Sequence, residues 1–477
     1  METYKNKTIY LIGIKGVGMA ALAVYFKEAG AKVYGSDTSE SFVTDKILEN
    51  SNISFFSSFD GKNLKSIKPD LVIVSASYGK ENPEVNVAKK RHLNVKYYSE
   101  TLGEITKDKK LIAVAGVHGK TTVAAMMAHV LDKAGFSPSF IVGAGHLANF
   151  KTNAKYGEGD YFVAEADEYR KSPVDNAPKF LDLSPQIAII TSIEFDHPDV
   201  FPNIEEIYNA FYRLACRVPR NGLIVLCTDY PKARKMLHSL VDKHYQTYGF
   251  GSDADWQIID LKEEENDSIF SLKKDASLAG RDAKIYGPYK LKTIGKHNVL
   301  NATAAIITAS YLEIADKVIK IAIESFLPVG RRYEIILNQN DLVIIDDYAH
   351  HPTAIKTTLE ATRNRFPKSK IWCVFQPHTY SRTEKLLNEF ARAFKDADKV
   401  IITDIYASAR EKEGNVSGAD LAFEIKKYQT GVRHISDIEK VKDFLLASVN
   451  PPAVILTIGA GDIYKLALEL KKNFKKG

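Results

Sequence analysis

The residues at positions 116 to 122 have the types and spacing of a phosphate-binding loop. The stretch reads GVHGKTT and follows the apolar run LIAVA. Backbone N–H groups of such a loop can surround phosphate oxygens, Lys120 can neutralise their charge, and a threonine hydroxyl can reach Mg²⁺. The usual first glycine, five residues before Gly119, is Val114 here, so the motif is a shortened variant. A glycine-rich turn that only begins a buried helix is the alternative. The candidate nucleotide-binding residues are Gly116, Val117, His118, Gly119, Lys120, Thr121 and Thr122.

Two acidic clusters follow the next apolar runs, in the stretches VAEADEY and SIEFDH. Because ligands of parallel α/β sheets gather at the carboxyl ends of strands, we expect both clusters to lie near the loop. Carboxylates and a neutral imidazole suit Mg²⁺, although solvated loop acids are the alternative for any one of them. The cluster residues are Glu165, Asp167, Glu168, Glu194, Asp196 and His197.

Amides occur in GKHNVLNATAA, at the start of a predicted helix. Asn298 and Asn301 can bond an adenine edge, and helix capping by asparagine is the alternative.

A second glycine loop, GIKGVGM, lies near the N-terminus between a predicted strand and an alanine-rich helix. Glycine lets the backbone approach a diphosphate, and the helix N-terminus supplies N–H donors. Asp37 follows about 20 residues later, where a dinucleotide fold has its ribose-binding acid. The glycine order is GxxGxG rather than GxGxxG, which is a weak dinucleotide signal, and a tight turn without a ligand is the alternative.

The C-terminal third holds GRRYE, DDYAHHPT and FQPHTYSR, each after an apolar strand or a domain junction. A cation that closes over ATP from another domain can stabilise the charge of a transferred phosphoryl group. A single histidine is more often structural, but a cluster this dense indicates a site. Its members are Arg331, Arg332, Asp346, Asp347, His350, His351, His378 and Arg382.

The elements that position these residues follow a βαβ pattern. Short apolar runs such as KTIYLIG, DLVIVSAS, QIAIITS and AVILTIG alternate with helical segments, which predicts parallel sheets. From about residue 245 to 290 the strands are shorter, which predicts a small β-rich appendage. We predict an α/β protein of three domains: a Rossmann-like domain over 1–107, a central P-loop ATPase domain over 108–326 and a Rossmann-like domain over 327–477.

Composition is typical of a globular protein. Of 477 residues, 45% are hydrophobic and 26% are charged, which supplies ample core material. The net charge of +6 is spread over several runs, so we expect no nucleic-acid partner. Cys227 and Cys373 lie in apolar runs and are predicted to be buried thiols. The sequence has no signal-peptide pattern or membrane-length apolar run, which predicts a cytoplasmic protein without a membrane partner.

Nine motifs, in order, resemble those of the Mur ligases over nearly the whole chain: GIKGVGM, GVHGKTT, EADE, EFDH, GKHNVLNA, GRRYE, DDYAHHPT, FQPHTYSR and GAGDI. The resemblance implies a Rossmann-like domain for a UDP-sugar, a central ATPase domain and a C-terminal domain that admits an amino acid. It implies ATP and Mg²⁺ as cofactors and a reaction in which ATP phosphorylates a carboxylate, an amine attacks the acyl phosphate, and phosphate leaves.

The resemblance also implies roles for particular residues. The first loop would hold the diphosphate of UDP rather than NAD, and the second would hold ATP together with Asn298, Asn301 and Asp347. The UDP-sugar candidates are Gly13, Lys15, Gly16, Val17, Gly18, Asp37 and Ser75. The metal candidates are Thr121, Glu165 and His197. The catalytic candidates are Lys120, His197, Arg331, His350, His378 and Arg382.

Two branches of this family fit the sequence. Members that add later residues use a carbamylated lysine after the DH motif, whereas this chain has no lysine between Lys179 and Lys232. This argues against those members and agrees with the branch that adds L-alanine to UDP-N-acetylmuramate in peptidoglycan precursor synthesis, without excluding the branch that recycles a murein tripeptide. The stretches EADEYRKSPVDNAPKF and EFDHPDVF instead favour the branch that recycles a murein tripeptide, whose carboxylates would pair with Arg170, Lys171 or Lys179. FQPHTYSR and IYASARE favour alanine, and we give that domain more weight because it admits the variable partner.

A non-catalytic, nucleotide-dependent regulator on the same fold is the alternative from another class, because fold does not fix function. We expect a monomer or a homodimer.

Overall fold

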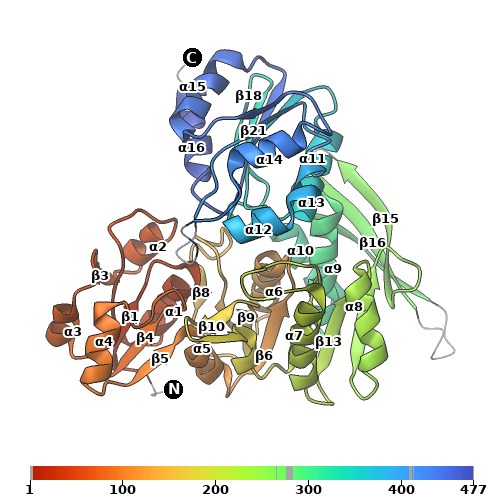
Figure 1. Cartoon of the computed structure of the whole chain (residues 1–477). Helices are drawn as coiled ribbons and strands as arrows, with labels where there is room; N and C mark the ends of the chain where they lie inside the picture. The colour runs from red at the N-terminus through yellow and green to blue at the C-terminus, as the bar shows by residue number, and fades with distance from the viewer. Residues whose placement is uncertain (1–3, 265, 276–282, 408–410, 412, 476–477) are drawn as a thin grey trace. The chain divides into compact units, whose positions relative to one another are not determined.

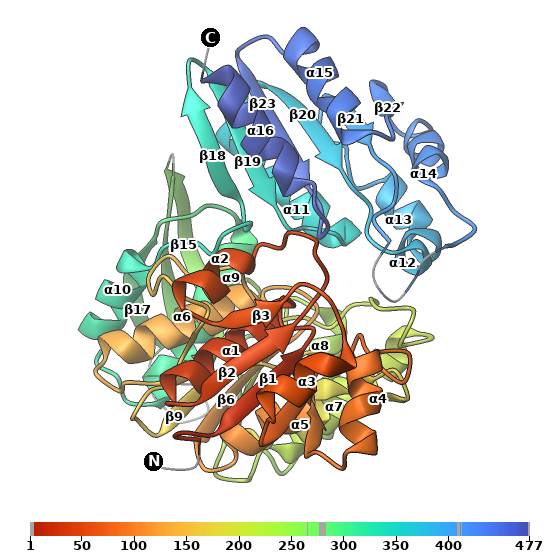
Figure 2. The ribbon, with the colours of Figure 1, turned by 90° about the vertical axis from the view of Figure 1, so that its left-hand side faces the viewer.

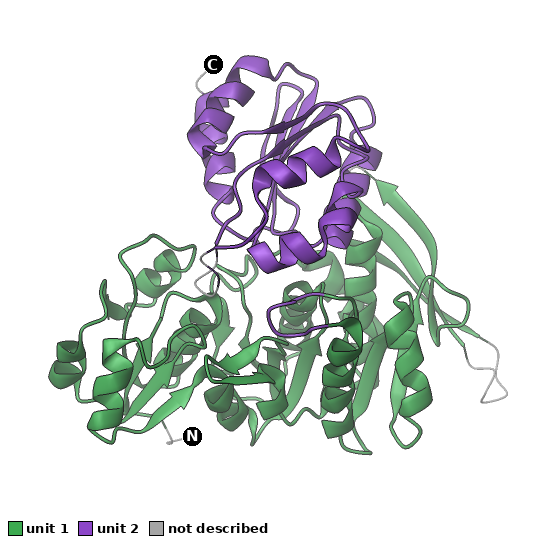
Figure 3. Ribbon diagram, viewed as in Figure 1, with its two compact units in different colours: residues 1–195, 203–329 green, residues 196–202, 330–477 purple. Residues whose placement is uncertain are grey.

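The computed structural model describes residues 4–264, 266–275, 283–407, 411 and 413–475. The chain forms two compact units, residues 1–195 with 203–329 and residues 196–202 with 330–477 (Figure 3). Helices and strands alternate along each unit, and the larger sheets are wholly or mostly parallel (Figure 1). The predicted α/β class is therefore confirmed. The predicted domain boundaries after residues 107 and 326 stay predictions.

The first sheet of unit 1 is five-stranded and parallel, in the order β3-β2-β1-β4-β5. Ile12 at the end of β1 pairs with Ser36 of β2 and Val74 of β4, so the carboxyl ends of these strands share one edge. Figure 2 shows this sheet with α3 and α4 side by side over it. The elements are β1 (Thr8–Ile12), α1 (Val17–Glu28), β2 (Lys32–Ser36), α2 (Asp45–Asn50), β3 (Ser54–Phe56), α3 (Gly61–Ile67), β4 (Leu71–Val74), α4 (Pro83–Lys90), β5 (Val95–Tyr97) and α5 (Tyr98–Thr106).

The second sheet of unit 1 has ten strands, in the order β17-β16-β15-β14-β13-β12-β6-β9-β7-β8. β6 lies between β12 and β9 and is parallel to both, and all but its first residue is buried, as expected for a parallel strand that is covered on both faces. The elements up to β14 are β6 (Lys110–Ala115), α6 (Lys120–Lys133), β7 (Ser139–Ile141), β8 (Ala154–Lys155), β9 (Tyr161–Glu165), β12 (Ile187–Ile190), α7 (Ile204–Arg217), β13 (Leu223–Cys227), α8 (Pro231–Met236), the short 3₁₀ helix Leu237–Ser239 and β14 (Tyr245–Gly249).

The β-rich stretch predicted from about 245 to 290 extends this sheet rather than standing apart from it. β14 and β15 continue the parallel order, and β16 and β17 add two antiparallel strands at the edge. These strands are β15 (Trp256–Glu264), β16 (Asp267–Lys274) and β17 (Lys284–Leu291), followed by α9 (Lys296–Tyr311) and α10 (Asp316–Ser325). A separate hairpin, β10 (Arg170–Ser172) with β11 (Asp175–Pro178), precedes the 3₁₀ turn Lys179–Asp182.

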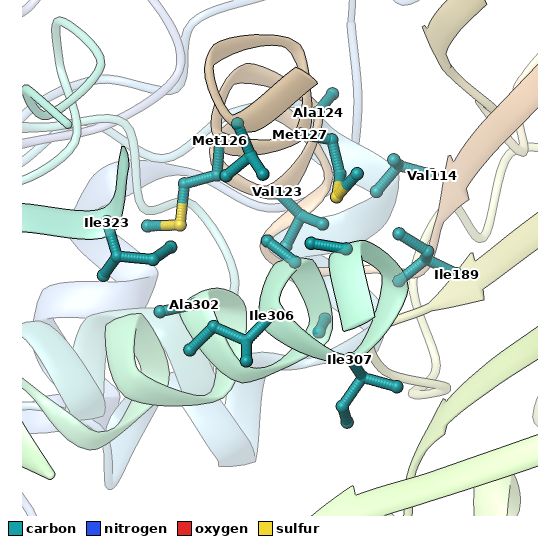
Figure 4. Packing of buried hydrophobic residues seen from close by; sticks show 14 of the residues in the cluster. Val114, Val123, Ala124, Met126, Met127, Ile189, Ala302, Ile306, Ile307 and Ile323 are labelled. Carbon is teal, nitrogen blue, oxygen red and sulfur yellow. The ribbon is translucent and has the colours of Figure 1, made fainter. Parts of the chain in front are cut away.

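The core of unit 1 encloses the helix that follows the nucleotide-binding loop. Residues 121–131 of α6 are all buried, and α6 packs against α9. Alanines such as Ala124 and Ala302 let the two helices approach closely, while Met126, Met127 and Ile306 fill the remaining space (Figure 4). The loop is therefore attached to a helix that cannot move independently of the core.

Unit 2 contains a six-stranded sheet in the order β18-β19-β23-β20-β21-β22, in which only the pair β18 and β19 is antiparallel. α16 packs over β19 and β23 and against α15 (Figure 2). The elements are β18 (Glu334–Gln339), β19 (Leu342–Asp347), α11 (Pro352–Arg365), β20 (Lys370–Phe375), α12 (Tyr380–Lys385), α13 (Leu387–Ala391), β21 (Lys399–Ile402), α14 (Gly418–Ile425), β22 (Val432–His434), α15 (Ile438–Ser448), β23 (Ala453–Ile458) and α16 (Tyr464–Phe474).

Cys227 and Cys373 are buried, as predicted, whereas Cys216 on α7 is exposed. Over the part of the chain that the structure describes, no helix has the length and apolar character needed to span a membrane.

Candidate functional site

The loop between β6 and α6 depends on two glycines with positive φ angles, 124° at Gly116 and 81° at Gly119. A Cβ atom at Gly116 would lie 2.2 Å from Oγ1 of Thr191, and one at Gly119 would lie 2.3 Å from Oδ1 of Asn301. Both positions therefore exclude a side chain for steric as well as conformational reasons. Asn301, predicted to contact adenine, thus lies directly against the loop.

Lys120 is the first residue of α6 and is largely buried by its surroundings. Its ammonium donates to the carbonyl of Gly116 at 2.6 Å and to Oε2 of Glu168 at 3.0 Å. Burial by itself would lower the pKa of Lys120, but the charges of Glu168, Asp167 and Glu165 outweigh it and hold the pKa above its ordinary value. The lysine is therefore a fixed positive charge at the loop, with Glu168 as its counter-ion.

Thr121 and Glu165, two of the predicted metal ligands, meet at the same sheet edge. The hydroxyl of Thr121 donates to Oε2 of Glu165 at 3.1 Å, and the backbone N–H of Gly143 donates to Oε1 at 2.5 Å. Glu165 ends β9 and Thr121 lies in the first turn of α6, so the parallel neighbours β6 and β9 bring them together. This forms a pair of hard oxygen donors beside the lysine.

The segment after β12 reaches the loop from the other side. Nε2 of His118 lies 2.7 Å from Oε2 of Glu194, and its backbone N–H donates to the Ser192 hydroxyl at 2.8 Å. The hydroxyl of Thr191 donates to the carbonyls of Ala115 and His118. The expected convergence of the two acidic clusters on the loop is thus observed for Glu165 and Glu194.

Asn298 faces its own backbone rather than an open space. Its amide donates to the carbonyl of Ile294 at 2.8 Å and to the Thr293 hydroxyl at 3.2 Å. Asn298 does not cap the helix, because the N-cap of α9 is Gly295 and no side chain caps it, whereas Asn301, one turn later, faces Gly119.

The first glycine loop connects β1 to α1. Gly13 has a φ of 80°, and a Cβ there would lie 2.9 Å from the side chain of Ser75, so these two predicted sugar-binding residues are neighbours. Asp37 accepts the backbone N–H of Lys15 at 2.7 Å and of Thr38 at 2.8 Å. Burial raises the pKa of Asp37 above its usual value. Asp37 therefore holds the loop in place through the backbone N–H of Lys15.

A buried cluster in unit 2 is centred on Arg382. Its Nε donates to Oδ1 of Asp196 at 2.6 Å, one terminal nitrogen lies 3.3 Å from Nδ1 of His197, and the other donates to the carbonyl of His378 at 3.2 Å. Burial would raise the pKa of Asp196, but the Arg382 guanidinium and the neighbouring imidazoles hold it well below the usual range. His197, the third predicted metal ligand, belongs to this cluster, whereas Thr121 and Glu165 belong to unit 1.

His350 lies beside this cluster in unit 2. Its Nδ1 is 3.0 Å from the carbonyl of Tyr348, and its ring centroid is 6.2 Å from that of His378. Burial, followed by the charge of Arg382, holds the pKa of His350 well below its usual value. Because a carbonyl only accepts hydrogen bonds, Nδ1 carries the proton and Nε2 of the neutral ring is an acceptor.

Arg331 is held by the protein itself. Its Nε donates to Oδ2 of Asp346 at 2.9 Å, and its terminal nitrogens donate to the carbonyls of Gly459 at 2.6 Å and Gly461 at 3.1 Å. Asp347, the predicted ATP contact, accepts the backbone N–H groups of Tyr333 at 2.8 Å and Ala349 at 2.7 Å. Burial raises the pKa of Asp347 to about 6. Both side chains connect the GRRYE segment to the sheet of unit 2.

Sequence reasoning did not single out the hydroxyls of Thr191 and Ser192 that bind the loop, nor Tyr348, which fixes the His350 ring. A signal for the hydroxyls was present, since both follow the apolar run of β12 at the edge where the loop was expected. Tyr348 acts through its backbone carbonyl, which residue type does not reveal. His351, noted as a site candidate, accepts the Thr353 N–H at 3.3 Å and caps α11.

Comparison with known families covers most of the chain. Residues 8–110 match the model described as the Mur ligase family, catalytic domain; residues 114–309 match the Mur ligase middle domain; and residues 331–461 match the Mur ligase, glutamate ligase domain.

Individual relatives match over nearly their full length. The chain is 38% identical over 464 residues to a UDP-N-acetylmuramate–L-alanine ligase of Desulfitobacterium hafniense, which covers 97% of this chain and 99% of the relative. The crystal structure of a UDP-N-acetylmuramate-alanine ligase of Thermotoga maritima superimposes with a TM-score of 0.82 at 26% identity, over 99% of this chain and 100% of that one. A murein peptide ligase of Psychrobacter arcticus shares the fold, with a TM-score of 0.73 at 24% identity over 98% of each chain.

Proposed function

Because this chain belongs to the Mur ligase family, we propose that it joins L-alanine to UDP-N-acetylmuramate with the consumption of ATP, in peptidoglycan precursor synthesis. The observation that carries the choice of alanine is the 38% identity to an alanine ligase over 97% of the chain. The first glycine loop would take the UDP diphosphate, and the loop at Gly116–Thr122 would take ATP. The cytoplasmic location and the monomeric or homodimeric state stay predictions.

The oxygen donors beside Lys120 fit Mg²⁺. Thr121 and Glu165 offer a hydroxyl and a carboxylate 3.1 Å apart, and Mg²⁺ prefers such hard oxygen ligands together with water and phosphate. We propose that these two residues hold the ion, and the assignment of His197 as a metal ligand stays a prediction. When bound, Mg²⁺ would neutralise phosphate charge during transfer.

Lys120 would change partner during the reaction. Its ammonium pairs with Glu168, and a γ-phosphate in the loop would compete for the same three donors. The substrate carboxylate attacks the γ-phosphorus, the bond to the β-γ bridging oxygen breaks, and ADP leaves with that electron pair. Lys120 stabilises the negative charge on the transferred group as this happens.

The second half of the reaction needs a neutral amine. The ammonium of alanine must lose a proton before its nitrogen attacks the acyl phosphate, and Nε2 is the acceptor nitrogen of the neutral His350 ring. We propose that His350 takes this proton. The nitrogen–carbon bond then forms, and the tetrahedral adduct loses inorganic phosphate to give the amide.

Arg382 would have an orienting role in the buried cluster of unit 2. It holds His378, Asp196 and His197 at once, so we propose that it orients these groups around the amino acid. That Arg331 and Arg382 directly bind oxyanions stays a prediction, since both guanidinium groups already have protein acceptors.

Ligation of a murein tripeptide is the second candidate, and the hairpin formed by β10 and β11 is the feature that favours it. Two of the three cations proposed to pair with the peptide carboxylates have other contacts, however. Lys171 pairs with Asp182, and the Lys179 ammonium lies 5.2 Å from the ring centroid of Tyr98 and 5.5 Å from that of Tyr169. This favours free alanine as the acceptor.

Phosphate release with saturating UDP-N-acetylmuramate and ATP tests the proposal. We expect the highest kcat/KM for L-alanine, with glycine and L-serine poorer by about 1–3 kcal/mol because a small methyl pocket discriminates weakly. A higher value for the tripeptide L-Ala-γ-D-Glu-diamino acid would overturn the acceptor and leave the ATP site in place. Binding of ATP without phosphate release for any acceptor would support the non-catalytic regulator instead.

A further inference from the structure

The ammonium of Lys15 is enclosed by the segment that follows β2. The residue is 4% exposed, and its Nζ donates to the carbonyl of Glu40 at 2.7 Å and lies 3.5 Å from Oδ1 of Asp45. The rings of Phe42 and Phe55 lie at 5.6 Å and 5.2 Å from the same nitrogen. A buried ammonium with these partners stabilises the surrounding structure, because removing it would take a cation away from the Asp45 carboxylate and a donor away from the Glu40 carbonyl.

The backbone of Lys15 is held by the same stretch, which we call the Asp37–Asp45 segment. The N–H of Lys15 donates to Asp37 at 2.7 Å, and its carbonyl accepts the Thr44 hydroxyl at 2.5 Å. Between its end residues the segment forms neither helix nor strand, so its position depends on such contacts. Lys15 therefore connects the glycine loop to the Asp37–Asp45 segment through both main chain and side chain.

Several N–H groups of the glycine loop donate to backbone carbonyls of the protein itself. Gly13 and Ile14 both donate to the carbonyl of Ser36, at 2.9 Å and 3.1 Å, and Gly16 donates to Gly13 at 3.4 Å. The donors left to meet a diphosphate are those of the first turn of α1, which begins at Val17. Their direction follows from how the loop before them is held.

The Asp37–Asp45 segment also reaches the stretch that holds Glu165. A Cβ added to Gly145 would lie 3.4 Å from Cβ of Val43, so these two residues are close neighbours. Two residues earlier, Gly143 donates its N–H to Glu165. One short irregular segment thus touches both the glycine loop and the neighbourhood of a candidate metal ligand.

From these contacts we infer that Lys15 is a positioning residue for the nucleoside diphosphate of the sugar substrate: it fastens the Asp37–Asp45 segment to the glycine loop and does not itself bind phosphate. The inference rests on the proposed function. The ammonium is committed to Glu40 and Asp45, so its contribution to substrate binding is indirect, through the direction of the N–H groups at the start of α1.

Variants on both sides of the Lys15–Asp45 pair test this directly. Lys15→Met keeps the apolar stem and removes the charge, Asp45→Asn weakens the pair from the other side, and Lys15→Arg retains a cation. Lys7→Met is the matched control, because Lys7 lies in the same domain and pairs with Asp70 at 4.0 Å on the surface. For each full-length variant, KM is measured for UDP-N-acetylmuramate and for ATP, and UDP binding is measured by calorimetry.

We expect Lys15→Met to raise KM for the sugar nucleotide about tenfold, with KM for ATP nearly unchanged, and Lys15→Arg to recover most of the loss. Asp45→Asn should act in the same direction and more weakly. A direct phosphate ligand would behave in the opposite way, because freeing the ammonium from Asp45 would tighten binding.

Three results would overturn the inference: tighter UDP binding in Asp45→Asn, an unchanged KM for the sugar nucleotide in folded Lys15→Met, or equal rises of both KM values. If Lys15→Met does not fold, Asp45→Asn and Lys15→Arg still decide. Failure of the proposed function is recognised separately, because the wild-type chain and Lys7→Met would then neither turn over nor bind UDP.

Discussion

The two glycine loops of unit 1 begin alike and end differently. Each follows a strand with parallel neighbours on both sides, each precedes a buried alanine-containing helix, and each contains one lysine. Lys120 is the first residue of its helix, and its ammonium folds back over the loop to Gly116 and Glu168. Lys15 precedes its helix by two residues, and its ammonium points into the Asp37–Asp45 segment.

The difference shows that the position of a lysine relative to the following helix determines which partners its ammonium reaches. At the first helical position the side chain returns over the loop, where the N–H groups that attract phosphate also lie. A lysine earlier in the loop, such as Lys15, points instead toward the segment that packs over the loop. These contacts support the proposals that Lys120 meets phosphate at its loop and that Lys15 holds its loop in place.

Neutralising Lys120 should produce the largest effect. Lys120→Met combined with Glu168→Gln removes the charge and leaves no unpaired buried carboxylate. We expect kcat to fall about 10²–10³-fold, the usual loss of one transition-state donor, with little change in the melting temperature. Steady-state phosphate release and thermal unfolding of the same preparation provide the measurement.

Lys110→Met is the control for that variant, because Lys110 lies at the far end of β6 from the loop and forms an exposed pair with Asp160. Lys120→Met alone should unfold more readily than the double variant, since buried Glu168 loses its counter-ion. Turnover near the wild-type rate in the double variant would contradict the assignment of Lys120.

Alanine substitution at matched glycines should sharpen the comparison. Gly119→Ala forces a positive φ on alanine and directs its Cβ to 2.3 Å from Asn301, so we expect a loss of about 2–4 kcal/mol in the free energy of unfolding. Gly16 has a φ of −57°, and a Cβ there would have its nearest contact at 3.6 Å. Gly16→Ala should therefore change the free energy of unfolding by less than about 0.5 kcal/mol. Equal losses in denaturant titrations would show that the glycines are not distinguished by geometry.

The smallest effect is a pH dependence of stability that arises from Asp347 in unit 2. Like Asp37, this carboxylate accepts two backbone N–H groups. The pKa of Asp347 is raised to about 6 from 3.8, chiefly by burial, so the folded chain retains a proton that the unfolded chain has released. Its contribution to stability is therefore present at low pH and is lost as the pH rises through about 6. Relative to Asp347→Asn, the wild type should lose about 1 kcal/mol of unfolding free energy between pH 5 and pH 7. A difference that grows with pH would contradict this sign.

Several parts of the candidate site were accessible from the sequence because they depend on local order. GVHGKTT after an apolar run predicts a loop at a strand end, and EADE and SIEFDH after the next runs predict acids at the same edge. The contacts of Thr121 with Glu165 and of His118 with Glu194 agree with that expectation. The edge strands after residue 245 were anticipated in type but not in their attachment to the central sheet, since strand pairing is a non-local property.

What the sequence by itself determined was the α/β class, the order of the elements and the identity of the groups at the strand ends, because hydrophobic periodicity and glycine turns are properties of neighbouring residues. Only the tertiary structure decided how those groups are used. Arg331 and Arg382 bind protein acceptors, and Asp37 and Asp347 accept backbone N–H groups. Lys15 and Lys120 each bind a carbonyl and a carboxylate, but from different segments of the chain. The physical reason is that a charged side chain, once buried, must find its counter-charge or hydrogen-bond partner wherever the fold provides one, and that partner can lie more than a hundred residues away, as Asp196 does from Arg382.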